Sequence, residues 1–598
     1  MSPYVQLIAL AVPLFLWSSV PVSVAAAAHA RQVTTRVNSG CKVIPGDSAW
    51  PNQQVWDGLN QTVGGRLIAT VSQAAVCHPG GYAGLLFAEA ECDVLASDWN
   101  LPQTFEGKSG EIMNPWYQNA SCSPYYRTDQ PCELGNYVSY AISVSSPEDV
   151  AAAINFTQRH NVRLVIKNTG HDFLGKSTGK GSLSLWTHNL KSISIAKNYT
   201  SAAYTGPAIK IGAGYTGGEV LLYAAAAGYT VVSGDCPTVG VSGGYSAGGG
   251  HGLLNGAYGL AADNVLEWEV VTADGRHLTA SPAQNADLYW ALTGGGAGTY
   301  AVVLSMTAKA HPEGHLGAAT LSFNATASPS NATYAAALDA WWRFLPAVVD
   351  TGAAPAFNYF AGGFLVYNTT APGKTAEDMA TLFQPYLAEL DTLGVPYTFA
   401  TYTAPSYLEH YNATNGPLPY GPYQGSELFN SRFIPRAAAE GEPERITAAM
   451  IEAMDLDPAA DFQFGCMGLN VNETRIQHPD NAVVPYWRDA VAVCLEFSAY
   501  DWTVPEATML ARRQELANTI HPLLVDATPG SGAYLNEADP LVYPQGDTAK
   551  WQDAFYGTNY ARLRQIKDAW DPHSVFYAFT AVGSEDWTEG ADGRLCRV

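Results

Sequence analysis

The sequence predicts an α+β protein built from two lobes. Its 598 residues exceed what one hydrophobic core usually fills, so more than one lobe is expected. A strand–helix–strand pattern occupies residues 137–167, and the composition changes near residues 320 and 530. These changes separate a glycine-punctuated, strand-rich region from a second region of strands and helices, which we expect to be a sheet with helices on one side.

The composition excludes several classes of protein. Hydrophobic residues make up 47% and charged residues 14%, whereas a disordered chain requires low hydrophobicity and high charge. The chain has 31 basic and 54 acidic residues, a formal net charge of -23. Such an acidic surface repels phosphate backbones, so we expect no nucleic-acid partner.

The first 30 residues read as a secretory signal peptide. An apolar run over residues 7–24 contains two prolines and ends in a tract of small residues, which is typical of a signal rather than a membrane anchor. No other stretch approaches the ~18 apolar residues that span a bilayer, so we expect a secreted protein without membrane attachment after signal removal. Nine glycosylation sequons agree with export: Asn60, Asn119, Asn155, Asn198, Asn324, Asn331, Asn368, Asn412 and Asn472.

Nine cysteines leave one over if the others pair in an oxidising compartment. Five of them lie in residues 41–132, which predicts a disulfide-rich region over residues 31–130. Cys236 lies alone in a glycine-rich tract and is the candidate for the unpaired thiol. The connectivity stays open, because eight paired cysteines allow 105 arrangements.

The clearest local pattern is a β-α-β unit. Residues 137–144 alternate as a strand, Ser146 and Pro147 open a helix that runs to about Arg159, and the apolar run 162–167 predicts a buried strand. Further on, Asp274 and Gly275 mark a hairpin within residues 266–280.

The second region begins near residue 320. Residues 356–368 read as a strand, a helix is predicted from Thr375 to about Gly394, and residues 396–404 return to strand. A polar, aromatic tail follows residue 530.

Two glycine-rich stretches are the candidate functional segments. The first, residues 168–181, matches the phosphate-binding P-loop pattern from Gly170 to Ser177. A P-loop must open a helix, but more glycines and an alternating strand follow here, which argues against a nucleotide hydrolase.

The second stretch, residues 233–252, contains two G-x-S-x-G matches, around Ser242 and Ser246. This pattern is also that of a serine-hydrolase nucleophile, which needs a strand before the serine and a helix after it. The surrounding glycines oppose a helix, so a secreted serine hydrolase is the less favoured alternative.

A third interpretation uses both stretches together. Dense glycine lets backbone N–H groups approach an anion, so the two loops are able to cradle a pyrophosphate. The pairing of residues 167–179 with 234–252, followed by 258–275, 291–303 and 534–572, resembles the berberine-bridge-enzyme-like branch of the vanillyl-alcohol oxidase / p-cresol methylhydroxylase-type FAD-linked oxidoreductases, as a fungal-type secreted member.

This resemblance implies FAD bound covalently twice, through His171 to the 8α-methyl group and through Cys236 to C6 of the flavin. It also implies a FAD lobe over residues 131–315, a substrate lobe with an antiparallel sheet over 316–530, and a segment over 531–598 that completes the FAD lobe. The other cofactor-binding residues implied are Asn168, Thr169, Gly170, Asp172, Gly175, Ser177, Gly234, Asp235, Thr238, Gly240, Gly243, Gly244, Ser246, Gly248, Asp263, Val265, Asn536 and Asn559.

The catalytic candidates also come from the resemblance. Val239 occupies the gatekeeper position, where valine resembles oxidases, and Tyr245 replaces a histidine found in many relatives. In the tail, Tyr534 is kept and Glu537 replaces a tyrosine proposed as catalytic base in plant members. A partly buried glutamate suits a general base, although a role as a hydrogen-bond partner is an equal alternative.

The function expected is a secreted oxidase. It would transfer hydride from an alcohol or similar C–H donor, an oligosaccharide or a specialised metabolite, to flavin, and dioxygen would be reduced to hydrogen peroxide. The alternative from another class is a non-catalytic sugar-binding protein that kept the scaffold. No metal site is predicted, because neither H-E-x-x-H nor a C-x-x-C pair occurs. The oligomeric state is open.

Overall fold

The computed structural model describes residues 40–79, 87–118, 122–126, 128–425, 427–458 and 460–598. The expected signal peptide therefore lies outside the described residues, as does the sequon at Asn119. Within the described part of the chain, no helix is both long and apolar enough to cross a membrane.

The predicted β-α-β unit is confirmed. Strand β2 (Tyr140–Ser143) leads into helix α4 (Pro147–His160) and strand β3 (Arg163–Lys167), and β4 (Ser182–Trp186) lies between β2 and β3 and runs parallel to both. A capping box on Ser146 and Asp149 begins α4, and Asn161 in the left-handed conformation ends it. Strand β1 (Leu67–Ala69) adds to β2 in antiparallel direction, so the region before residue 130 contributes to this sheet.

A second sheet of the first lobe is wholly antiparallel. Its order is β5 (Ile193–Thr200), β6 (Thr205–Gly212), β10 (Ala301–Lys309), β8 (Val265–Thr272) and β9 (His277–Ala280). Strands β8 and β9 form the predicted hairpin, and Gly275 takes a φ of 82° in its turn.

The second lobe is a seven-stranded antiparallel sheet. Its order is β15 (Thr398–Ala404), β12 (Leu316–Asn324), β14 (Gly363–Pro372), β13 (Ala354–Phe360), β17 (Gln463–Gly468), β18 (Ala490–Ala499) and β16 (Glu427–Pro435). The prediction of one strand over residues 356–368 is wrong, because the chain reverses after Phe360 and forms the β13–β14 hairpin, with Gly362 at a φ of 68°. Both halves are apolar, and the sequence alone gave no signal for the turn beyond the glycine pair.

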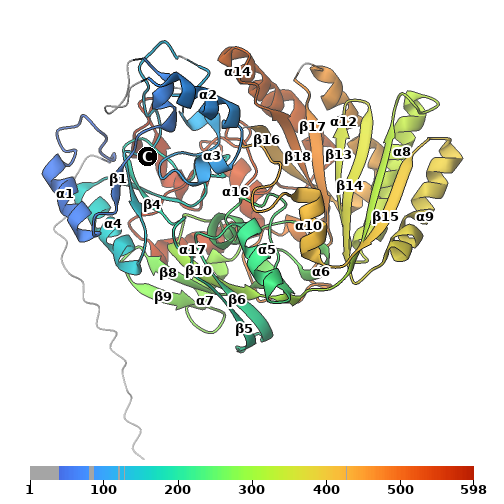
Figure 1. Cartoon of the computed structure of the whole chain (residues 1–598), viewed down its shortest axis with the longest axis horizontal. Helices are drawn as coiled ribbons and strands as arrows, with labels where there is room; N and C mark the ends of the chain where they lie inside the picture. Colours follow the sequence, from blue (N-terminus) through green and yellow to red (C-terminus); the bar gives the residue numbers. More distant parts are fainter. Residues whose placement is uncertain (1–39, 80–86, 119–121, 127, 426, 459) are drawn as a thin grey trace, which may run out of the picture. The chain divides into compact units, whose positions relative to one another are not determined.

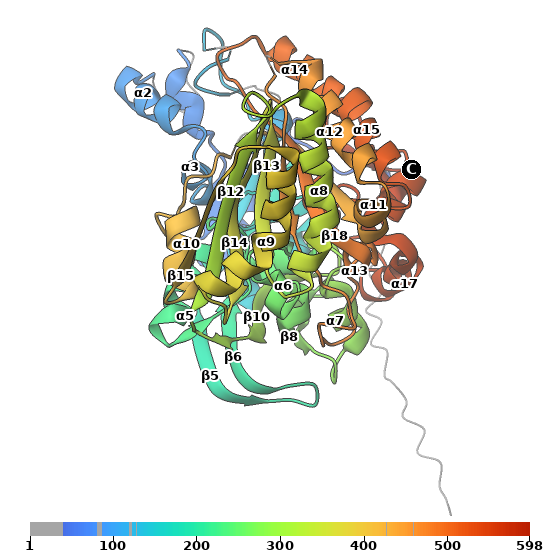
Figure 2. The ribbon, with the colours of Figure 1, turned by 90° about the vertical axis from the view of Figure 1, so that its right-hand side faces the viewer.

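Long helices cover one face of this sheet. They are α8 (Asn331–Val349), α9 (Ala376–Leu393) and α12 (Pro443–Leu456), which lie in front of the strands in Figure 2. Helix α9 starts and ends as predicted, with a capping box on Thr375 and Gly394 in the left-handed conformation. The buried Trp341 and Trp342 of α8 pack in the core between helices and sheet.

The C-terminal segment packs with the first lobe. Its helices α16 (Thr548–Tyr556) and α17 (Tyr560–Trp570) belong to the same hydrophobic cluster as strands β6, β8 and β10. The last strands, β19 (Trp587–Glu589) and β20 (Leu595–Arg597), form a hairpin. The chain thus leaves the first lobe, builds the second and returns (Figure 1).

The remaining helices are short and lie around these sheets. They are α1 (Gln53–Thr62), α2 (Glu89–Asp98), α3 (Gln103–Glu106), α5 (Gly217–Ala226), α6 (Asn255–Tyr258), α7 (Ala286–Leu292), α10 (Tyr407–Asn415), α11 (Arg436–Gly441), α13 (Tyr486–Asp489), α14 (Glu506–Glu515) and α15 (His521–Ala527). A two-stranded pair, β7 (Tyr229–Thr230) and β11 (His311–Pro312), precedes the second lobe.

All nine cysteines are described, and eight of them form four disulfides. Two close short loops in the N-terminal region, Cys77–Cys92 and Cys122–Cys132, and Cys466–Cys494 joins β17 to β18. Cys41 pairs with Cys596, 555 residues later, so one of the N-terminal cysteines links that region to the C-terminal segment. Cys236 is the unpaired thiol, as predicted.

Candidate active site

The first glycine-rich stretch forms a tight loop between β3 and β4. The carboxylate of Asp172 accepts hydrogen bonds from the backbone N–H groups of Leu174, Lys176 and Ser177 and from the Ser177 hydroxyl, over 2.7–3.2 Å. Gly175 lies inside this turn with a φ of 73°. No helix follows the loop before β4, so the phosphate-binding P-loop interpretation does not hold.

Buried groups fix the base of this loop. Lys167 is 1% exposed, and its ammonium donates to the carbonyl oxygen of Lys108 at 2.7 Å and to those of Asn168 and Thr169 at 3.3 and 3.4 Å. The Asn168 amide donates to the Ala213 carbonyl at 2.7 Å. Gly170 has a φ of 98°, and a Cβ there would lie 3.0 Å from the Glu111 carbonyl, so glycine suits this close approach.

The second stretch carries the unpaired cysteine next to the first. The buried hydroxyl of Thr238 lies 2.7 Å from Nε2 of His171 and 3.3 Å from Sγ of Cys236. Burial, together with the charge of Lys167, lowers the pKa of His171 to about 4, so its imidazole is neutral near pH 7. Burial raises the pKa of the Cys236 thiol to about 12, against the opposing hydrogen bond to Thr238.

The Asp235 carboxylate joins this loop to the second lobe. It accepts hydrogen bonds from the hydroxyls of Tyr367 and Tyr423, at 3.1 and 3.0 Å, and from the amide of Asn415 at 2.6 Å. The Tyr411 hydroxyl donates to the carbonyl oxygens of Gly234 and Asp235. Asp235 was expected to bind cofactor; in the structure its side chain is engaged with the second lobe and positions the neighbouring Cys236.

The glycines after Cys236 leave open space. Residues Val241–Tyr245 form one helical turn with non-helical backbone at Ser242 and Gly243, which the predicted absence of a helix did not foresee. An added Cβ at Gly243 or Gly244 would meet nothing within 4 Å. At Gly240 and Gly248 it would instead collide with the amides of Asn168 and Asn536.

The two serines of this stretch are not nucleophiles. The Ser242 hydroxyl donates to the Ile211 carbonyl at 3.1 Å, and the Ser246 hydroxyl donates to the Val241 carbonyl at 2.8 Å. Both are buried, and each donates to a backbone carbonyl instead of a general base. The structure therefore gives no support to the serine-hydrolase interpretation.

The C-terminal segment reaches the same site, as predicted. The Asn536 amide donates to the Gly244 carbonyl at 2.8 Å, and the Lys176 ammonium donates to the Leu535 carbonyl at 2.9 Å. The Glu537 carboxylate lies 3.0 Å from Nε2 of His251. Residues from both glycine-rich loops and from the tail therefore meet around one site.

The His251–Glu537 pair is the main titratable feature here. Burial alone would lower the pKa of His251, but the Glu537 carboxylate raises it above its usual value. Sequence patterns could not indicate this contact, because 286 residues separate His251 from Glu537 in the chain. The contact forms because the C-terminal segment packs against the first lobe.

The tyrosines are poor candidates for the base. The Tyr245 hydroxyl donates to the His251 carbonyl at 2.9 Å, and the Tyr534 hydroxyl accepts from the Asn536 amide at 2.8 Å. Burial raises the pKa of Tyr245 well above its usual value, and burial together with the charge of Glu537 does the same for Tyr534. Both hydroxyls therefore stay protonated near neutral pH.

Sequence reasoning missed Glu427, the first residue of β16. Side chains alternate along a strand, so Glu427 shares a face with Phe429 and Ser431. The Phe429 ring stacks on Phe173 at 4.2 Å, and the Ser431 hydroxyl accepts from the Tyr534 N–H. Burial and the charge of Glu537 raise the pKa of Glu427 to about 7. The sequence offered little signal, because β16 also contains the polar residues Asn430, Ser431 and Arg432.

Three residues implied to bind the cofactor are held by contacts within the protein, and their role toward the cofactor stays a prediction. The Asp263 carboxylate binds the Arg488 guanidinium with two 2.8 Å contacts and accepts from the Asn481 amide. The Asn559 amide donates to the carbonyls of Ala482 and Val483, and Val265 is buried at the start of β8. The contacts of Asp263 and Asn559 hold residues 481–488 against the first lobe and the C-terminal segment.

The residues present fit a flavin. Within the described part of the chain, several buried polar atoms in or near the loops lack hydrogen-bond partners, among them Asn168 Oδ1, Tyr117 OH, Ser233 Oγ and His251 Nδ1. Such atoms are costly unless a ligand or water pairs with them. Together with the open space at Gly243 and Gly244, they favour a polar planar group held between the loops and the tail.

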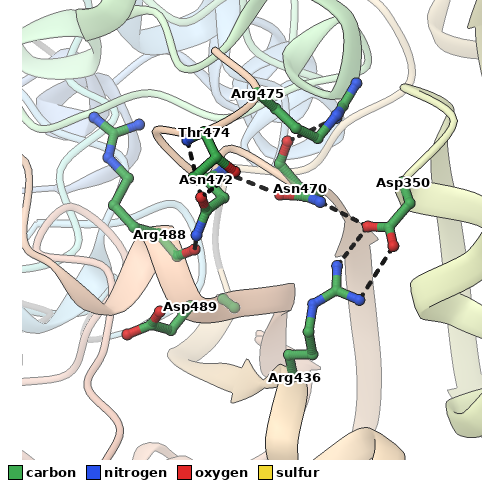
Figure 3. A pocket seen from close by; sticks show the side chains of 9 residues that line it. Asp350, Arg436, Asn470, Asn472, Thr474, Arg475, Arg488 and Asp489 are labelled. Atoms are coloured by element: carbon green, nitrogen blue, oxygen red, sulfur yellow. Dashed lines mark hydrogen bonds and ion pairs between the residues drawn. The ribbon is translucent and has the colours of Figure 1, made fainter. Parts of the chain in front are cut away.

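A surface pocket of about 370 Å³ lies elsewhere, lined by Asp350, Arg436, Asn470, Asn472, Thr474, Arg475, Arg488, Asp489 and Ala490. Figure 3 shows that Arg436 pairs with Asp350 there, at 2.5 Å, and that Asn470 donates to the same carboxylate. Among the described residues, no group of three His, Cys, Asp or Glu side chains is placed to hold a metal.

The fold and site define a two-lobed FAD-binding protein, and comparison with known proteins agrees. Residues 138–281 match the family described as FAD binding domain, and residues 533–583 match the family described as berberine and berberine like. The chain belongs to the berberine-bridge-enzyme-like branch of the VAO-type FAD-linked oxidoreductases and is an FAD-dependent oxidoreductase.

Three similar proteins illustrate the relationship. FAD-linked oxidoreductase orf1 of Neocamarosporium betae is 66% identical over 94% of this chain and 95% of its own length. Bifunctional decalin synthase calF of Penicillium decumbens is 46% identical over 95% of this chain and 97% of its own. The crystal structure of the VAO-type flavoprotein MtVAO615 from Myceliophthora thermophila is 44% identical, with a TM-score of 0.88 over 93% of this chain and all of that one.

Proposed function

We propose that this protein is a secreted oxidase whose FAD is bonded to both His171 and Cys236. The observation that carries the proposal is the meeting of these two side chains at the Thr238 hydroxyl, with Cys236 the one cysteine outside the four disulfides. Nδ1 of His171 has no hydrogen-bond partner within the described residues, so it is free to form a bond. The FAD lobe would comprise residues 131–315 and 531–598, and the substrate lobe 316–530.

Bound FAD would supply the hydride acceptor, and the chain would supply the proton acceptor. We assign this role to the Glu537 carboxylate, which would take the O–H or N–H proton of the substrate at Oε1 or Oε2. His251 holds that carboxylate through Nε2 at 3.0 Å and fixes its orientation. Dioxygen as the final acceptor is supported by the similarity to a named flavoprotein oxidase, 45% identical over 93% of this chain, and by valine at position 239.

The substrate class is narrowed by the relatives rather than by the site. The relative named as a decalin synthase favours a specialised metabolite over an oligosaccharide.

Four disulfides support folding in an oxidising compartment and therefore secretion. Eight of the nine sequons lie in described residues; Asn368 is 1% exposed in β14, so a glycan there is incompatible with the fold.

The test is a hydrogen-peroxide screen of purified protein against alcohols, phenols, polyketides and oligosaccharides, with catalase as control. An oxidase produces peroxide with at least one donor. A non-catalytic binding protein would bind sugars and produce none, and that outcome would refute the proposal. Acid precipitation adds a second readout, because yellow colour retained in the pellet reports covalent flavin. His171→Ala and Cys236→Ala should each retain it through the remaining bond, and the double variant should release it.

A further inference from the structure

One hydroxyl contacts both of the side chains proposed to bond the flavin. His171 lies between β3 and β4 and Cys236 lies 65 residues later, yet Thr238 Oγ1 is 2.7 Å from His171 Nε2 and 3.3 Å from Cys236 Sγ. The Thr238 side chain is completely buried, so solvent does not compete for these contacts. No other described side chain is hydrogen-bonded to either residue.

A single hydroxyl hydrogen couples the states of the two residues. In one arrangement the His171 Nε2–H donates to Oγ1, and the Oγ1–H donates to Sγ of Cys236. In the other, the Oγ1–H donates to Nε2, and the Cys236 S–H donates to Oγ1. Because the histidine is neutral and carries one ring proton, the choice also decides whether Nδ1 carries it.

Only the first arrangement prepares both nucleophiles. It leaves the lone pair of Nδ1 unprotonated, and it directs a hydrogen-bond donor at sulfur, which stabilises a thiolate. In the second arrangement Nδ1 is protonated and cannot form a bond without first losing that proton. The hydrogen bond from the Thr238 hydroxyl, together with one from the Thr238 backbone, opposes the effect of burial on the thiol pKa.

We propose that Thr238 is the positioning residue for flavin attachment, and that its hydroxyl selects the reactive tautomer of His171 and activates the thiol of Cys236 at the same time. The inference rests on the proposed double attachment. For each bond, an N–H or S–H bond and one C–H bond of the flavin break and one N–C or S–C bond forms. The two electrons and two hydrogens released reduce one dioxygen to one hydrogen peroxide.

The test compares three variants of the full-length protein expressed with FAD. Thr238→Val keeps the side-chain shape but removes the hydroxyl, and Thr238→Ser keeps the hydroxyl. Thr238→Ala removes the hydroxyl without any added volume, in case the valine variant does not fold. Peptide mass spectrometry measures the fraction of His171 and Cys236 bonded to flavin, and alkylation after denaturation measures free Cys236 thiol. Neither readout depends on enzyme activity.

We expect the wild type and Thr238→Ser to carry both bonds. Thr238→Val and Thr238→Ala should carry both in less than a tenth of the molecules, with free Cys236 thiol correspondingly increased. Full double attachment in a folded variant that lacks the hydroxyl would overturn the role of Thr238 and leave the proposed function intact. Equal loss in Thr238→Ser would also overturn it, because shape rather than the hydroxyl would then matter. Absence of covalent flavin in the wild type would instead refute the double attachment itself.

Discussion

At the scale of single residues, two carboxylates in different environments share the site. Glu537 is held by His251 and comes from the tail, whereas Glu427 opens strand β16 of the second lobe. The charge of Glu537 is one cause of the raised Glu427 pKa, so the two groups sense one another. Neighbouring carboxylates whose environments separate their protonation states are a common basis for assigning acid and base roles.

The first prediction separates the roles of these two acids. Glu537→Gln should slow flavin reduction by substrate about 10²–10⁴-fold, because it removes the proton acceptor while keeping the shape. Glu427→Gln is the matched control and should slow it less than about tenfold. Anaerobic stopped-flow reduction with a donor found in the peroxide screen measures both rates. The reverse ranking would transfer the role of base to Glu427.

The second prediction concerns stability and pH. The pKa of Glu427 is about 7 in the folded protein and near 4.5 when unfolded, so the folded state loses this proton at a higher pH than the unfolded state does. The free energy of unfolding therefore falls as pH rises from about 4.5 to 7, by up to about 3 kcal/mol. Glu427→Gln cannot ionise and should be more stable than wild type at pH 8, by up to that amount, with no gain at pH 4.5.

Urea unfolding of both proteins at the two pH values checks this expectation. The gain must grow between pH 4.5 and pH 8. A difference of the same size at both values would show that Glu427 acts through packing instead of ionisation.

At the scale of elements, two glycines of the second glycine-rich stretch are needed for different structural reasons. Gly248 is close-packed, since a Cβ there would lie 2.3 Å from the Asn536 amide that donates to the Gly244 carbonyl. Gly244 lies four residues earlier and would meet no protein atom within 4 Å. Gly248 therefore allows the loop to pack against the C-terminal segment, whereas Gly244 borders the space that we assign to the cofactor.

The third prediction uses this contrast. Gly244→Ala should fold normally, shown by an unchanged far-ultraviolet circular dichroism spectrum, but should bind less flavin, because its methyl group enters the cofactor space. Gly248→Ala should displace Asn536 and lower the free energy of unfolding by about 1–3 kcal/mol. Absorbance ratios measure flavin per protein. A full complement of flavin in Gly244→Ala would place the cofactor elsewhere.

At the scale of the whole molecule, the chain is closed on itself. The Cys41–Cys596 disulfide joins residues separated by 555 positions, and the C-terminal segment before Cys596 packs in the core of the first lobe. Cross-linking lowers the entropy of the unfolded chain more for a longer loop. The fold therefore depends on both ends of the chain.

The fourth prediction ranks two disulfides by this effect. The paired substitution of Cys41 and Cys596 by serine should lower the free energy of unfolding by about 3–5 kcal/mol. Serine at Cys77 and Cys92, which close a loop of 15 residues, is the matched control and should cost less, about 2–3 kcal/mol. Urea midpoints of the two variants provide the measurement, and equal or inverted losses would contradict the ranking.

The sequence by itself determined the features that depend on local chemistry. Helix α4 follows from a capping box and a first-turn proline, helix α9 from its cap and Gly394, and the β8–β9 hairpin from Asp274 and Gly275. Counting cysteines identified Cys236 as unpaired, and the motifs in order indicated a flavin protein with a returning tail.

Only the tertiary structure decided which distant residues meet. The sequence could not give the Cys41–Cys596 pairing, the turn that divides residues 356–368, the contact between His251 and Glu537, or the place of Glu427 beside them. Periodicity and capping act over a few residues, whereas these contacts join segments tens to hundreds of residues apart. Which of these residues meet is determined when the sheets pack and the C-terminal segment joins the first lobe, because burial then decides which polar groups must pair.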